Sequence, residues 1–185
     1  MLTGDFWSSV SYSFIRILSG FLIALLSGVL LAAISGGHKL IETLLWPYVA
    51  VIKSTPVASF IILCLIWLDS SSLSVFISFL MVLPVVYTNI LQGIKSTDKE
   101  LLEMAAVFKM KLFKKLKYIY LPQVKPYLLS ACTLSLGLCW KAGIAAEVIG
   151  MPDGSIGERL YEAKIYLSSQ DLFAWTVVII VISIL

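Results

Sequence analysis

Four charged residues lie within or beside long apolar stretches of this 185-residue sequence: Arg16, Lys53, Lys141 and Glu147. A charge at the centre of a bilayer costs several kcal/mol, so each is a candidate for binding a solute. Arg16 lies near the start of its stretch and can extend to the surface, and Lys53 directly precedes a Ser-Thr-Pro break that favours an anchor at the interface. Lys141 and Glu147 are therefore the better candidates for chemistry inside the membrane.

Lys141 lies roughly 20 Å along a helix from Tyr127, in the farther half of a hydrocarbon core about 30 Å thick. Glu147 follows six positions later, about 240° around the helix, so the two side chains cannot pair on one face. We expect Lys141 and Glu147 to belong to a path for an anionic or strongly polar solute. The alternative is that Lys141 packs against a carboxylate or a carbonyl elsewhere in the protein.

Metal binding and nucleophilic catalysis find little support in the residue types. The three cysteines lie inside apolar runs, where they are most simply small buried hydrophobes, and the single histidine, His38, cannot build a metal site alone. An intramembrane enzyme would need converging catalytic groups, such as several histidines or a serine with a lysine at membrane depth. We expect no catalytic residue, no metal and no cofactor in this chain.

The composition requires a solvent other than water. Hydrophobic residues make up 59% of the chain and charged residues 14%, against about 45–50% and about 25% in soluble domains. The mean hydropathy is +0.97. Disorder, nucleic-acid binding and a secreted disulfide scaffold are excluded, because each needs many more charges or cysteines. The sequence therefore predicts an integral membrane protein.

Five apolar segments are candidates for membrane spans, and their unbroken length favours α-helices over barrel strands of about ten alternating residues. They cover residues 14–34, 44–68, 73–91, 127–149 and 172–185. The last segment is shorter than the roughly 20 residues of a full span, so we expect the chain to be cut inside a helix. The prediction is a single all-α transmembrane domain over residues 1–185, a helical bundle.

Lysine is concentrated in one connection. Residues 95–125 hold eight lysines, and Lys39 adds a ninth on the same side if the spans alternate, whereas the opposite side holds two basic residues. Cytoplasmic loops retain Lys and Arg, so the Lys-rich loop 95–125 is expected to face the cytoplasm. The loop at 150–171 would then lie outside, and its sequence predicts turns followed by a surface helix from Ile156 to Ile165.

Small residues recur at every fourth position on two of the predicted helices. The rows are Gly20, Ala24, Gly28, Ala32 and Gly36 in the first segment, and Ala131, Ser135, Cys139 and Gly143, continuing to Glu147, in the fourth. Such rows let the backbone of a neighbouring helix approach closely. Both rows are therefore expected to lie at helix–helix contacts.

The connection at residues 95–126 is too long for a simple linker. Thr97, followed three residues later by Glu100, forms a capping box that predicts a helix start. The helix should continue to Phe108 and place Ala105 and Phe108 on one apolar face. The residues alone leave three interpretations open: a helix lying on the membrane, a helix packed under the bundle, or a helix bound in a partner's groove.

This connection resembles a known motif. Glu103–Ala106 (EMAA) is followed by Lys109 and then by Ile119–Pro122 (IYLP), at the spacing of the E-A-A-x3-G-x9-I-x-L-P loop of ABC-importer permeases. Met104 replaces the first alanine of the pattern and Lys109 replaces its glycine. Glycine accepts a positive φ at a helix C-terminus without steric cost, whereas lysine there costs on the order of 1 kcal/mol or requires a different turn.

The resemblance covers nearly the whole chain. The stretches Ser13–Phe21, Pro47–Ala58 and Ala145–Gly157 are similar to binding-protein-dependent permeases of the nitrate/sulfonate/taurine type. Such permeases have six helices, so the resemblance implies that the first helix and the end of the sixth lie outside this chain. It also implies a multi-pass protein of the plasma membrane.

The resemblance further implies a division of labour. Two permease copies, most simply a homodimer, form the translocation path, an external binding protein delivers the solute, and cytoplasmic ATPase subunits bind ATP and Mg²⁺. The coupling residues that carry over from the motif are Glu103, Ala105, Ala106, Lys109, Leu121 and Pro122. The chain has no G-x-x-x-x-G-K-[ST] loop, so ATP hydrolysis is expected in the partner. A channel or transporter of another kind is the alternative, and it would not need this loop.

Overall fold

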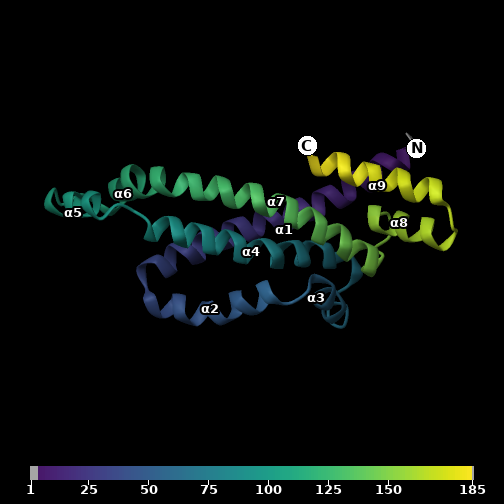
Figure 1. Ribbon diagram of the computed structural model, residues 1–185, viewed down its shortest axis with the longest axis horizontal. Coiled ribbons are helices and arrows are strands. Elements are labelled where there is room, and N and C mark those ends of the chain that lie inside the picture. The colour runs from purple at the N-terminus through teal and green to yellow at the C-terminus, as the bar shows by residue number, and fades with distance from the viewer. Residues whose placement is uncertain (1–3, 185) are drawn as a thin grey trace.

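The computed structural model describes residues 4–184, and this part of the chain is helical without strands. In chain order the elements are α1 (Gly4–Gly37), α2 (Lys39–Ser54), α3 (Val57–Cys64), α4 (Ser70–Lys95), α5 (Lys99–Val107), α6 (Leu112–Lys115), the π-helical turn η1 (Leu116–Tyr120), α7 (Leu121–Gly150), α8 (Ile156–Ile165) and α9 (Ser169–Ile184). Figure 1 shows α1, α4 and α7 lying side by side along the long axis of the molecule. The expected all-α architecture is confirmed.

Three helices are long and apolar enough to cross a membrane. They are α1 with 34 residues, α4 with 26, and the continuous run from α6 through η1 to α7, which has 39 residues. At 1.5 Å per residue this last helix extends roughly 58 Å, about twice the thickness of the hydrocarbon core. One end of it must therefore project well beyond the bilayer.

The small-residue row of α1 faces α4, and the two backbones approach closely there. A Cβ added at Gly28 would lie 2.9 Å from the Val86 side chain, and one added at Gly20 would overlap the carbonyl of Val75. The alanines of the row are fully buried. The predicted helix contact is confirmed, and its partner is α4.

The corresponding row on α7 is buried as well. Ala131 and Ser135 are completely shielded from solvent. A Cβ added at Gly143 would lie 2.8 Å from the Ser78 hydroxyl of α4 and would also meet Ile17 of α1. The central helix α4 therefore packs extensively on both α1 and α7.

The second predicted segment is not one straight helix. α2 and α3 meet at a 102° bend, because Pro56 has no backbone N–H and the preceding Thr55 is extended, with φ −85° and ψ 133°. The C-terminal α9 has 16 residues, fewer than a full span. By length and composition the described residues hold three spans, or four with the bent pair counted as one. The count of five stays a prediction.

α2 lies beside α4, outside the core, and none of its residues is buried. Its first turn is held by an ion pair with 2.5 Å between Glu42 Oε1 and Lys95 Nζ. Near its end, Lys53 Nζ donates to Thr88 Oγ1 at 3.0 Å. Lys53 is therefore bonded to a hydroxyl of the neighbouring helix at the α2–α4 contact.

The two ends of the bundle carry different elements. Figure 1 shows α5 and α6, which belong to the lysine-rich connection, at one end, and α8 with the start of α1 at the other. The Glu42–Lys95 pair places the start of α2 at the end where α4 finishes. This arrangement agrees with the alternation of connections on which the predicted orientation depends.

Replacing Gly20 with alanine should separate α1 from α4, because the new methyl group meets a backbone carbonyl that cannot turn away. We expect a loss of about 1–3 kcal/mol of stability, measured as a lower midpoint of thermal unfolding in detergent. Gly37→Ala is the control, since a Cβ there meets nothing within 4 Å. Equal midpoints for the two variants would contradict the close contact.

Candidate functional site

The helix of the lysine-rich connection, α5, begins at Lys99, and its N-cap is Asp98 instead of the predicted Thr97. The Asp98 carboxylate accepts the N–H of Glu100 at 2.9 Å. Thr97 belongs to the end of α4, where its hydroxyl donates to the Gly93 carbonyl at 3.4 Å. The predicted capping box is wrong. Thr97 and Asp98 are both good N-caps, but the Thr97 side chain is used in the turn that ends α4, so Asp98 caps α5.

The C-terminal end of α5 is closed by a Schellman turn. The N–H of Lys109 donates to the Ala106 carbonyl at 3.0 Å, and the N–H of Met110 donates to the Ala105 carbonyl at 2.9 Å. Lys109 occupies the left-handed position of this turn, with φ 46°. The two alanines of the motif thus supply the carbonyls of the cap, and the tight turn forms although lysine stands at the glycine position.

The outward surface of α5 is apolar. Met104, Val107 and Phe108 are 45%, 79% and 72% exposed, whereas Ala105 is 2% exposed. Phe108, three residues after Ala105 and at the C-cap of the helix, is exposed, so the expected apolar face is buried only at Ala105. Together with the exposed carboxylate of Glu103, these side chains form an uncovered apolar surface with a polar edge, which we call the α5 face.

The second half of the motif leads into α7 through a widened helical turn. Pro122, in the first turn of α7, lacks the N–H that an α-helix would direct to the carbonyl four residues earlier, which accounts for the π-helical η1 just before it. Ile119 is buried and Leu121 is exposed. The N–H of Asp98 donates to Gln123 Oε1 at 2.9 Å. The start of α5 is therefore fastened to α7 beside Leu121 and Pro122.

The two charged residues singled out on α7 lie apart. Lys141 is exposed, and within residues 4–184 it forms no ion pair or side-chain hydrogen bond with another residue, whereas Glu147 is completely buried. The prediction that they occupy different faces is confirmed. Within residues 4–184, no carboxylate forms an ion pair with Lys141, as the alternative interpretation would require.

Glu147 connects three helices through one serine. The Ser13 hydroxyl of α1 donates to Glu147 Oε2 at 2.6 Å, and the same Ser13 oxygen accepts the N–H of Ile156, the first residue of α8, at 3.0 Å. A Cβ added at Gly157 would overlap the Glu147 backbone and side chain, so α8 sits directly against α7. Ser13 was not identified from the sequence, although it lies one helical turn before the buried Ile17.

A polar stripe runs along the open side of α7. Ser130, Thr133, Gly137 and Lys141 fall within about a quarter of the helix circumference at 100° per residue. Ser130, Thr133 and Lys141 are exposed, and Gly137 has nothing within 4 Å of where a Cβ would stand. The sequence analysis found only the last member, because the others are small and carry no charge.

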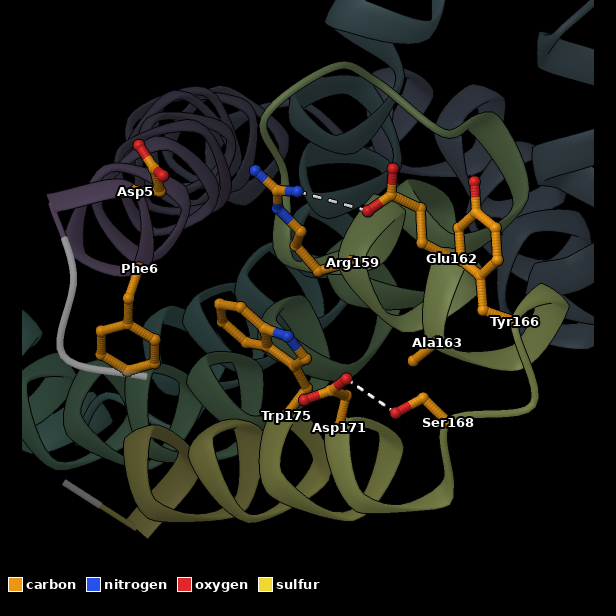
Figure 2. A pocket seen from close by; sticks show the side chains of 9 residues that line it. All are labelled: Asp5, Phe6, Arg159, Glu162, Ala163, Tyr166, Ser168, Asp171 and Trp175. Carbon is orange, nitrogen blue, oxygen red and sulfur yellow. Dashed lines mark hydrogen bonds and ion pairs between the residues drawn. The ribbon is translucent and has the colours of Figure 1, made fainter.

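At the opposite end from α5, the predicted surface helix is present as α8, with the boundaries Ile156–Ile165. Figure 2 shows a cavity there, lined by Phe6 of α1, Arg159 and Glu162 of α8, and Trp175 of α9. Its volume is about 340 Å³. Phe6 and Trp175 stack in it with 5.2 Å between ring centroids, and Arg159 pairs with Glu162 at 3.3 Å. No group of acidic, histidine or cysteine side chains in the described part of the chain is arranged to hold a metal ion.

Long apolar helices around a packed α4, with an uncovered helix projecting from one end, are typical of a membrane-spanning protein with a docking element outside the bilayer. Residues 8–185 match the family described as binding-protein-dependent transport system inner membrane component, and the chain belongs to that family. This confirms the resemblance drawn from the loop motif.

Individual relatives in this family are similar over most of the chain. An Escherichia coli K12 protein assigned to aliphatic sulfonate transport as the permease SsuC is 32% identical over 168 residues, covering 90% of this chain and 64% of its own length. The Bacillus subtilis protein assigned the same name is 27% identical over 184 residues, covering 98% and 66%. The nitrate import permease protein NrtB of Synechococcus elongatus is 27% identical over 149 residues, covering 80% and 53%. The chain thus spans about two thirds or less of the length of these relatives.

Replacing Lys109 with glycine should stabilise the end of α5, because glycine adopts a positive φ without the steric cost that lysine incurs. We expect a gain of about 0.5–1 kcal/mol, seen as slower amide hydrogen exchange at Met110, whose N–H closes the turn. Lys111→Gly is the control, because φ is −62° at that position. A gain from the control alone would contradict the strained turn.

Proposed function

We propose that the chain is the membrane-spanning permease subunit of an ATP-driven importer, and that it couples to a cytoplasmic ATPase through the α5 face. The observation that carries this proposal is the exposed apolar surface of α5. The C-terminal end of α5 is capped at the motif positions, and its start is bonded to α7 by the Asp98–Gln123 hydrogen bond. An apolar surface of this kind is suited to a partner's groove. ATP and Mg²⁺ are then bound by the ATPase and not by this chain.

The connections of α5 suggest how a movement would be transmitted. Its N-cap follows directly on the end of α4, and the same residue is bonded to the first turn of α7. α4 and α7 are also extensively packed on one another. A displacement of α5 by the ATPase would therefore be passed to α4 and α7 together, as one body, and would tilt them against the rest of the assembly.

The orientation follows from the lysines. With the lysine-rich loop 95–125 in the cytoplasm, α8 and the cavity of Figure 2 face the outside, where a binding protein would dock. In this orientation the projecting end of the 39-residue helix would be the one that carries α6 and η1, because the lysines there are suited to water and not to lipid. The family match and the long apolar helices support a multi-pass subunit of the plasma membrane.

The polar stripe of α7 is our candidate for the wall of the translocation path. The Lys141 ammonium group, which has no ion-pair partner within residues 4–184, is costly against lipid tails, so this side of α7 is better matched to water and to a second permease copy, most simply a homodimer. Lys141 would attract an anionic solute. The relatives named above for sulfonate and nitrate transport support a small anion as the substrate class. Glu147 would influence the path from its buried position.

The coupling proposal is tested by Val107→Asp. This substitution would place a carboxylate in the middle of the α5 face, and burial of that charge against the ATPase should lower co-purification of the two subunits by at least about tenfold. Leu167→Asp is the matched control, because Leu167 is also a largely exposed apolar residue but lies at the α8 end. Solute uptake that continued without ATPase would contradict the importer function itself.

The path proposal is tested at Lys141. In proteoliposomes containing the complete transporter, Lys141→Ala should reduce uptake of the anionic solute by about tenfold, because a hydrogen bond to a charged group contributes about 1.5–3 kcal/mol. Lys141→Arg keeps the charge and should retain most of the activity. Unchanged rate and specificity in Lys141→Ala would remove Lys141 from the path.

A further inference from the structure

Two buried oxygen atoms near the α8 end of the bundle have no hydrogen-bond partner within residues 4–184. They are Glu147 Oε1 and Ser74 Oγ. Both residues are completely buried, and Ser74 of α4 and the backbone of Gly157 are polar neighbours of the Glu147 carboxyl group in addition to Ser13. Buried polar atoms are nearly always paired in folded proteins, because an unpaired one costs about 1–3 kcal/mol. The other carboxyl oxygen, Oε2, already accepts the Ser13 hydroxyl.

Glu147 forms no ion pair within residues 4–184, although the charge of Arg16 on α1 reaches it. On α1 the nearest basic residue is Arg16, whose guanidinium donates to the Tyr12 hydroxyl and lies over the Tyr12 ring. On α8 the nearby titratable group is Glu158, which accepts the N–H of Gly154 at 2.6 Å. The polar group that α4 places beside the Glu147 carboxyl group is the hydroxyl of Ser74. An ionised carboxylate here would be a buried, unpaired charge, which proteins avoid.

We propose that Glu147 is a buried proton-binding site. Its carboxyl group is neutral, it carries the proton on Oε1 and donates it to the Ser74 hydroxyl, while Oε2 continues to accept from Ser13. This assignment pairs both orphan oxygen atoms and leaves no charge to balance. It goes beyond the proposed transport function, because the contacts among α1, α4, α7 and α8 that carry it are present whether or not the chain transports a solute.

The neutral carboxyl group would act as a latch for α8. Through Ser13 it reaches the N–H of Ile156, and Gly157 packs against its backbone, so the first turn of α8 rests on this site. α8 also supplies Arg159 and Glu162 to the cavity of Figure 2. Loss of the proton would place a charge under α8, draw in water and release the helix together with this wall of the cavity.

The proton itself is detected by infrared spectroscopy of the full-length protein in lipid nanodiscs. The wild type should show the carbonyl stretch of a protonated carboxylic acid, and this band should disappear in Glu147→Gln and shift in Ser74→Ala, where the acceptor of the proton is removed. Glu162→Gln, at a partly exposed carboxylate, is the control and should leave the band in place. Loss of a carboxylate band in Glu147→Gln, instead of an acid band, would overturn the proposal.

The latch is tested by amide hydrogen exchange at Ile156 and Gly157 in the same samples. Glu147→Gln should keep the protection, because a carboxamide supplies an acceptor for Ser13 and a donor for Ser74, whereas Glu147→Ala should exchange at least about tenfold faster. Ser13→Ala is a smaller change that should also speed exchange, and it serves if Glu147→Ala does not fold. Exchange in Glu147→Gln as fast as in Ser13→Ala, or protection that requires Na⁺, would show that an ionised carboxylate holds α8.

Discussion

The close approach of α1 and α7 to α4 is the contact on which the rest of the structure depends. In a bilayer, lipid tails solvate leucine as well as another helix does, so burial of large apolar side chains gives little reason for helices to associate. The glycines and other small residues at these contacts bring backbones together and gain dispersion energy instead. Because α4 takes part in both contacts, it fixes α1 and α7 relative to each other, and the polar groups at the two ends of the bundle are positioned from it.

The two ends use this scaffold differently. At one end α5 is tied to α4 by the chain and to α7 by a single hydrogen bond, and its apolar face has no partner within the described residues. At the other end α8 is held by the Ser13–Glu147 network and by the direct contact of Gly157. One end therefore exposes an apolar helix that is available to a partner, and the other is closed by a buried polar group.

Much of this arrangement was predictable from the sequence where one strong pattern acts alone. The small-residue rows, the boundaries of α8 and the opposed faces of Lys141 and Glu147 follow from helical periodicity and from clear turn residues. The prediction failed where two residues compete for one role, as Thr97 and Asp98 do for the N-cap. It also could not find the bond between Ser13 and Glu147, since residues 134 positions apart meet only through the packing of α1 on α7.

The length of the helix that ends at Gly150 has a mechanical consequence. Leu112 and Lys141 lie roughly 52 Å and 9 Å from Glu147 along the helix axis, at 1.5 Å per residue. If the helix swings about its end at Glu147, its far tip travels about six times as far as the lysine. The helix is then a lever that reduces displacement and multiplies force: a stroke of several ångströms at the tip becomes a shift of about one ångström beside Lys141.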